Sequence, residues 1–157
     1  MKLETLFLKI AVVIIGIPVF VLCILGLFRI ISDSVNPEYA PLLYPILFGM
    51  YASTIPFFIA LIQTMRLLAF IDKNKAFSDF SVKALKNIKY CAFTISIVYV
   101  VETPFFYLLA EKDDAPGIIL IGMGFVFASF VVAVFAAVLQ KLFISAIDIK
   151  KENDLTV

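Results

Sequence analysis

The stretch "PGIILIGMGFVFASFVVAVFAAVLQ" (116–140) contains no Asp, Glu, Lys or Arg. A helix rises about 1.5 Å per residue, so a segment of this length can cross the hydrocarbon core of a bilayer, which is about 30 Å thick. Backbone polar groups in lipid must be hydrogen-bonded within the segment, and a helix achieves this despite the many β-branched side chains present. The stretch therefore predicts a transmembrane helix.

Three other parts of the chain are also long apolar runs, and Glu102 is the only charged residue in any of them. These apolar runs cover residues 10–28, 42–65 and 90–110. Of all 157 residues, 63% are hydrophobic, a share that a soluble fold of this size would leave partly exposed to water. We therefore predict an all-α, polytopic membrane protein in which four transmembrane helices form a single membrane domain over residues 1–157.

The distribution of Lys and Arg predicts how the chain is threaded. Of the 13 basic residues, 11 lie in the N-terminal segment, in the loop 66–89 or in the tail 141–157, and 2 lie in the other two loops. Loops rich in Lys and Arg stay on the cytoplasmic side of a membrane. We therefore expect a protein of the cell membrane with both termini and the loop 66–89 in the cytoplasm.

The loop between the second and third spans has a helical pattern of its own. At about 100° per residue, "FIDKNKAFSDFSVKALKNIKY" (70–90) places apolar and polar side chains on opposite sides of a helix. The apolar side holds Phe77, Phe80, Ala84, Leu85 and Ile88, and the polar side holds Asp79, Lys83, Lys86, Asn87 and Lys89. Ser78 stands where an N-cap residue is expected. The pattern predicts a basic amphipathic helix in this loop.

Two interpretations of the amphipathic helix remain open. It can lie on the anionic headgroups of the bilayer and fix the topology, or it can be a docking surface for a cytoplasmic partner. Both interpretations use the same candidate contact residues, which are Phe77, Phe80, Lys83, Lys86 and Lys89. Because the helical pattern is the same in the two cases, it does not choose between them.

Glu102 indicates a second candidate site, because a charged group near the middle of a membrane usually faces protein or water. Counting about twelve residues from the inner end of each span places Ser53, Thr54 and Ser129 at a similar depth. Thr103 is the next residue in the chain. The predicted intramembrane polar site therefore consists of Glu102, Thr103, Ser53, Thr54 and Ser129.

Three roles are open for Glu102. In a structural role the carboxyl is protonated and hydrogen-bonds across helices to Ser53, Thr54 or Ser129. In a functional role it binds a proton, a cation or another ligand. In the third role it lies near enough to the outer end of its span to reach interfacial water.

Small residues recur at helical spacing in the fourth span and predict close packing against a neighbouring helix. They are Gly124, Ala128 and Ala136 in one row and Ser129, Ala133 and Ala137 in another. The neighbour can belong to the same chain or to a second copy, because spacing alone does not distinguish the two.

Three stretches of the sequence resemble a known family. "FIDKNKAFS" (70–78), "SVKALKNIKY" (81–90) and the ending "KKENDLTV" (150–157), together with the four-span layout, are similar to the bacterial membrane family known as domain of unknown function 2975. Its members are small integral membrane proteins whose genes often sit beside a small helix-turn-helix regulator of the Cro/repressor type. The resemblance implies a regulatory membrane partner of such a regulator and implies no catalytic residues.

Enzymatic chemistry is not expected from these residues. The sequence has no His, no Gly-rich phosphate-binding loop, no nucleophile elbow and no pair of intramembrane carboxylates. Cys23 and Cys91 lack the spacing of a metal site. We predict a protein that is not an enzyme, with no cofactor, no metal ion and no direct contact with nucleic acid.

Three functions remain open at this point. The first is the regulatory partner that the resemblance implies. The second is a transporter or ion pathway that uses Glu102, which would need a homo-oligomer because four spans are few for a pathway. The third is an immunity protein against a membrane-active peptide.

Overall fold

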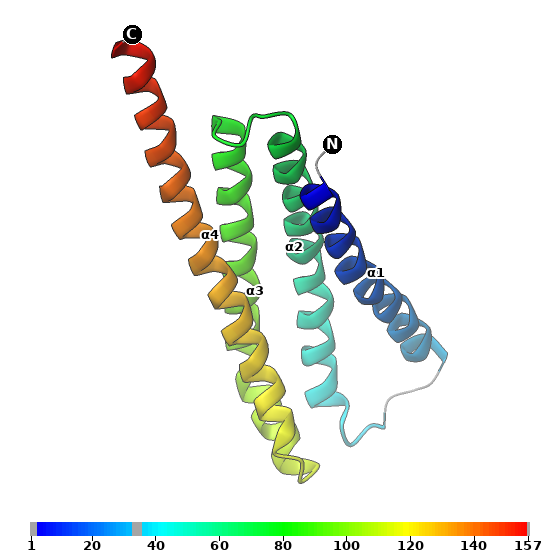
Figure 1. Cartoon of the computed structure of the whole chain (residues 1–157). Helices are drawn as coiled ribbons and strands as arrows, with labels where there is room; N and C mark the ends of the chain where they lie inside the picture. Colours follow the sequence, from blue (N-terminus) through cyan, green and yellow to red (C-terminus); the bar gives the residue numbers. More distant parts are fainter. Residues whose placement is uncertain (1–2, 33–35, 157) are drawn as a thin grey trace.

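The structure, a computed structural model, describes residues 3–32 and 36–156, and four long helices make up most of them (Figure 1). The helices are α1 (Leu3–Ser32), α2 (Ala40–Asp72), α3 (Asp79–Lys112) and α4 (Gly117–Thr156). Within the described residues there is no strand, and all four helices are long and apolar enough to cross a membrane. The predicted all-α, polytopic architecture is confirmed.

The helices extend beyond the predicted spans, and α4 extends furthest. It has 40 residues and continues through the tail to Thr156. Because the tail contains no Gly or Pro, nothing in its sequence interrupts the helix. At about 1.5 Å per residue, residues 141–156 add about 24 Å beyond the predicted span. The start of α1, the end of α4 and the turn between α2 and α3 lie at the same end of the bundle (Figure 1), which we call the basic end.

Residues 79–89, predicted to form a helix of their own within the loop, are the first turns of α3. Ser78 has extended backbone and its side chain accepts a hydrogen bond from the Ser81 amide at 3.4 Å, as expected for an N-cap residue. The first 25 residues of α3 contain no Gly or Pro, so the helix passes from loop to span without a break. The connection from α2 is short and turns at Asn74, whose φ of 58° lies in the left-handed region that Asn tolerates.

α3 is the central helix of the bundle. It packs along both α2 and α4, whereas among the described residues α1 packs only on α2. In Figure 1, α1 lies near α2 at its start and diverges from it toward its end. Thr5 is the only buried residue described in α1, and a helix that is apolar all round without protein cover is suited to lipid. The protein therefore consists of a packed three-helix unit and one peripheral helix.

An apolar groove of about 350 Å³ lies between α1 and α2. Its walls are side chains from residues 12–20 of α1 and 58–65 of α2. Beyond the groove, the Tyr51 hydroxyl donates a hydrogen bond of 3.0 Å to the carbonyl oxygen of Cys23. This bond joins the second half of α1 to the first half of α2.

The core lies on both sides of α3. Ile46 of α2 and Tyr99 and Phe106 of α3 form a buried apolar cluster. α4 packs tightly on α3 at Gly122, since a Cβ atom there would lie 3.2 Å from the Phe106 ring. The small residues predicted to pack against a neighbour divide into three groups: Ala133 and Ala136 are buried, Ser129 and Ala137 are half-buried, and Gly124 and Ala128 are exposed.

Candidate functional site

The Glu102 side chain lies between α3 and α2, pressed against Gly49. It is only 5% exposed. A Cβ atom built on Gly49 would lie 1.5 Å from the Glu102 Oε1 atom, so any side chain at position 49 would occupy the space that the carboxyl group fills. Gly49 thus makes room for a carboxyl group at the helix contact.

About one helical turn before Glu102, a pair of hydroxyl groups joins α2 to α3. The Ser53 hydroxyl donates to the Met50 carbonyl oxygen at 2.8 Å, and Ser53 Oγ is 3.2 Å from Tyr99 Oη. A serine hydroxyl has one hydrogen, so Ser53 cannot also donate to Tyr99. The hydrogen in the second bond therefore comes from Tyr99. Tyr99 is itself buried and its ring stacks on Phe125, with a centroid separation of 5.0 Å.

The other predicted members of the polar site bond to their own helices. Thr103 donates to the Tyr99 carbonyl oxygen at 2.9 Å and Thr54 donates to the Tyr51 carbonyl oxygen at 2.6 Å. Ser129 donates within α4, to carbonyl oxygens one turn earlier. Short hydroxyl side chains inside helices often bond in this way, which leaves them with no hydrogen for a neighbouring helix.

The prediction that Glu102 hydrogen-bonds to Ser53, Thr54 or Ser129 is wrong, because the structure contains none of these bonds. Both carboxyl oxygens are buried and have no hydrogen-bond partner among the described residues. Since they are also inaccessible to solvent, the carboxyl group does not reach interfacial water. The structure bonds Ser53 to Tyr99, which precedes Glu102 by three residues on α3, and it places Ser129 on α4, bonded to its own helix.

Gly49 and Tyr99 were missed by the sequence reasoning. Tyr99 carried a usable signal, because it precedes Glu102 by three residues and so shares its helix face. Gly49 carried none, because the contact joins residues on different helices that are distant in the chain.

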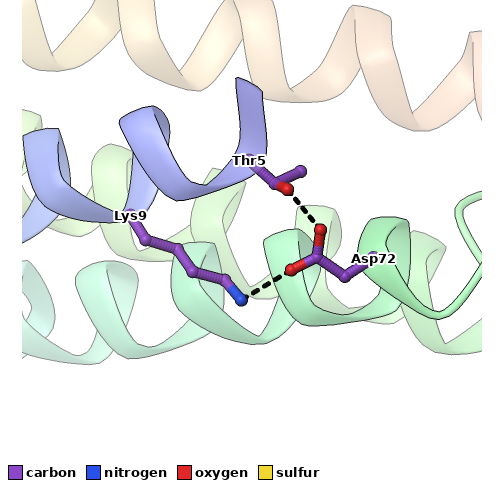
Figure 2. Close-up of polar contacts among 3 residues, drawn as sticks. All are labelled: Thr5, Lys9 and Asp72. Atoms are coloured by element: carbon purple, nitrogen blue, oxygen red, sulfur yellow. Dashed lines mark hydrogen bonds and ion pairs between the residues drawn. The ribbon is translucent and has the colours of Figure 1, made fainter. Parts of the chain in front are cut away.

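At the basic end, a carboxylate joins α1 to α2. Figure 2 shows Asp72, the last residue of α2, between Thr5 and Lys9 of α1. The Lys9 ammonium is 2.7 Å from Asp72 Oδ2, and the Thr5 hydroxyl donates to Asp72 Oδ1. These hydrogen bonds, the one from Lys9 above all, hold the pKa of Asp72 below its usual value. We call this arrangement the Asp72 clasp, and the sequence reasoning did not predict it.

The predicted docking residues are divided between the interior and the surface. Ala84, Leu85 and Ile88, from the apolar side of the predicted helix, are buried within the bundle. Phe77 and Phe80 remain 52% and 64% exposed, although each ring packs against a phenylalanine ring of another helix. Their partners are Phe143 of α4 for Phe77 and Phe70 of α2 for Phe80. The apolar side of the helix therefore serves mainly to pack the protein's own helices.

The three predicted lysines also differ from one another. Lys83 and Lys86 are exposed, whereas Lys89 is half-buried and donates a hydrogen bond of 3.1 Å to the Gln140 side chain. Near them, a groove of about 370 Å³ lies between the α2–α3 turn and α4 and includes Lys75 and Lys150 in its walls. The exposed part of this surface is therefore basic, with two aromatic rings at its edge.

The described residues contain no group of three or more His, Cys, Asp or Glu side chains that could hold a metal ion. Cys23 and Cys91 are both free thiols. The carboxyl group of Glu102 stands without a second carboxylate or an imidazole beside it, so the arrangement offers proton binding rather than paired acid and base groups.

Comparison with known proteins places this architecture in a family. The family described as "Protein of unknown function (DUF2975)" matches residues 30–157. The chain is 58% identical over 158 residues to the "Uncharacterized membrane protein YoaS" of Bacillus subtilis (strain 168), and the match covers 99% of each chain. No solved structure matches.

Proposed function

Because this chain belongs to the DUF2975 family, whose function is unknown, we propose that it is a non-enzymatic regulatory partner that captures a helix-turn-helix regulator at the membrane. It is a small multi-pass membrane protein, and the proposed capture uses the basic end. The threading predicted from Lys and Arg would place this end in the cytoplasm.

The observation that carries the proposal is an ordered, basic and uncovered surface at this end. We call it the capture surface, and it consists of Phe77, Phe80, Lys83, Lys86, Lys150 and Lys151, all of which are exposed. Its lysines lie on the first turns of α3 and the last turns of α4, which are both continuous with the spans, and Phe77 lies in the turn before α3. Exposed acids, Asp79, Asp148, Glu152 and Asp154, lie among these residues in the chain. A surface held by two long helices keeps its shape without a partner, which lowers the entropy cost of binding.

The distance by which α4 extends beyond its predicted span favours a soluble partner over lipid. The headgroup region adds about 5 to 8 Å to each side of the hydrocarbon core. Lys150 lies ten residues after Gln140, so it stands about 15 Å beyond the predicted span. A side chain at this height extends past the headgroups and can contact a protein in solution.

The charge of the capture surface indicates which part of a regulator it would contact. Proteins that bind DNA present a basic surface to the phosphates, and this would be repelled by the exposed lysines. The contact should therefore involve an acidic surface on the other side of the regulator. Opposite charges would also speed the encounter, in a salt-dependent way.

The experiment uses membrane vesicles that contain the full chain and a small helix-turn-helix regulator of the Cro/repressor type. We expect the regulator to sediment with vesicles of the parent protein. Capture should be lost with Lys83→Glu/Lys86→Glu and with deletion of residues 150–157. The matched control is Lys83→Arg/Lys86→Arg, which keeps the charge. Unchanged capture by the reversed-charge protein, once its orientation in the vesicle has been verified, would end the proposal.

A further inference from the structure

We propose that Glu102 is a proton-binding site within the membrane, formed where α3 meets α2, which holds its proton while the two helices are packed and releases it when they separate. The regulatory function proposed above does not depend on this site, and the site does not depend on that function.

Burial without a partner is the first observation. Both carboxyl oxygens of Glu102 are inaccessible and have no hydrogen bond among the described residues. A buried charge needs an opposite charge or several donors to remain in place, and a carboxyl group that has neither stays neutral. The packed arrangement therefore suits the acid form of Glu102.

The hydroxyl groups next to this level of the helices have no hydrogen left for Glu102. Each has already used its one hydrogen: Ser53 on Met50, Tyr99 on Ser53 and Thr103 on the Tyr99 carbonyl oxygen. Their oxygens keep lone pairs, so they can accept a hydrogen bond but cannot donate one. None of them forms a hydrogen bond with the carboxyl oxygens, so none supplies the donor that a carboxylate would require.

Two prolines add further acceptors near this level. Pro56 and Pro104 lie inside α2 and α3, and neither has a backbone N–H. The carbonyl oxygens four residues earlier, on Ala52 and Val100, therefore lack their usual helical donor. One of these carbonyls precedes Ser53 in the chain and the other lies two residues before Glu102, so each proline removes a backbone donor from its helix at about this level.

The charged and titratable groups on the packed helices leave Glu102 without a compensating cation. Tyr99 shares its face on α3. On α2, Tyr51 points to the Cys23 carbonyl oxygen of α1. Residues 117–140 of α4 include no Asp, Glu, Lys or Arg. On α3 the cations lie toward the two ends, where Lys112 donates to the Glu38 carbonyl oxygen and Lys89 to the Gln140 side chain. No ion pair with Glu102 forms among the described residues.

The close contact with Gly49 identifies the ligand as a proton rather than a metal ion. Oxygen ligands surround a metal cation at about 2 to 2.6 Å and several are needed. The Glu102 carboxyl group itself fills the space beside Gly49, and no second carboxylate is present there. A proton binds to the carboxyl oxygen itself and needs no additional space. An ionised carboxyl group could leave this contact only if α2 and α3 moved apart to admit water.

The test uses dicyclohexylcarbodiimide, an apolar reagent, on the full chain in lipid vesicles. The acid proton moves to a carbodiimide nitrogen, the carboxyl oxygen bonds to the central carbon, and rearrangement leaves a stable N-acylurea. Mass spectrometry locates the adduct. We expect labelling at Glu102 at about pH 5, decreasing as the pH is raised to about 9. Glu102→Gln should remove the adduct and still insert into the membrane.

The Ser53→Ala variant distinguishes a proton-binding site from a carboxyl group that is merely buried. It removes the acceptor of the Tyr99 hydrogen, which then becomes free to donate to an ionised Glu102. The pH of half-maximal labelling should therefore fall by about one unit. Tyr99→Phe removes this hydrogen, so combining it with Ser53→Ala should abolish the fall. A mere loss of packing would not produce this pattern.

Gly49→Ala should move the pH of half-maximal labelling away from the value of the parent protein, because the added methyl group displaces the carboxyl group. The matched control is Gly124→Ala, since a Cβ atom there meets nothing within 4 Å, and its curve should equal that of the parent. Absence of labelling at every pH would overturn the proposal, and so would labelling that does not vary with pH. Suppression of labelling by sodium ions at constant pH would also overturn it, because the site would then take a metal cation.

Discussion

At the scale of single residues, Gly49 determines how closely α2 approaches the polar group on α3. The Glu102 oxygens occupy the volume in which any other residue would carry its Cβ atom. Cores resist added volume because the neighbours must leave their preferred rotamers. The contact therefore depends on the absence of a side chain as much as on the presence of the carboxyl group.

Gly49→Ala should destabilise the protein by about 1 to 3 kcal/mol, since one methyl group is forced into a filled contact. The measurement is thermal unfolding in detergent, with Gly124→Ala as a control that should unfold at the temperature of the parent. If the two variants unfolded at the same temperature, the tight contact at Gly49 would be refuted.

The Asp72 clasp should weaken in acid. Its pKa is lower in the folded protein than in the unfolded chain, so its contribution is fully present above the unfolded value of about 4 and is lost as the pH falls through the lower folded value. Spin labels at positions 3 and 73 should show a broader distance distribution below about pH 4. Asp72→Asn should broaden it at neutral pH, and a narrow distribution in that variant would contradict the clasp.

The sequence alone identified some of these residues and not others. Glu102 stood out because it is the only charge in an apolar run, and Ser53 because of its depth in the neighbouring run. Gly49 and Asp72 gave no such signal. Their partners lie on other helices, 53 and 63 residues away in the chain, and spacing along one helix carries no information about contacts between helices.

At the scale of elements, α3 joins the span to the basic end without a break, and its first turn depends on Ser78. This side chain accepts from the Ser81 amide and donates to the Lys75 carbonyl oxygen at 2.7 Å. Losing an N-cap serine typically costs about 1 kcal/mol. Ser78→Ala should therefore speed hydrogen exchange in residues 79–83, whereas Ser145→Ala, at an exposed position inside α4, should not. Equal exchange in both variants would show that the cap does not hold this turn.

The existence of the four helices could be predicted because apolar length is a direct consequence of bilayer thickness. The ends of the helices could not be predicted in the same way. Hydropathy falls where lipid ends, yet α3 begins at Asp79 and α4 continues to Thr156, because helices stop at caps and breakers rather than at the headgroups. The amphipathic pattern of 79–89 was detected, but its apolar residues pack against α2 and α4 as well as facing outward.

At the scale of the whole molecule, the orientation predicted from Lys and Arg can be measured directly. In a background with Cys23→Ser and Cys91→Ser, a cysteine at position 114 should react with a membrane-impermeant maleimide in intact cells. A cysteine at position 75 should react only after permeabilisation. The opposite result would reverse the threading and remove the capture surface from the cytoplasm.

The family match begins at residue 30, near the end of α1, and covers the three helices that pack together. α1 contacts this unit through α2 alone among the described residues. The arrangement of the helices was not predictable from the runs themselves, because all four are apolar and lipid solvates each of them equally well.

The length of α1, together with its few contacts to α2, makes its tilt sensitive to bilayer thickness. It has 30 residues and is therefore about 45 Å long, longer than the hydrocarbon layer that it crosses. Long helices accommodate a thinner bilayer by tilting. α1 is held by Asp72 at its start and by the Tyr51 hydrogen bond at Cys23, so a greater tilt would first strain the Tyr51 bond. Lipid composition would then set how widely the apolar groove beside α2 opens.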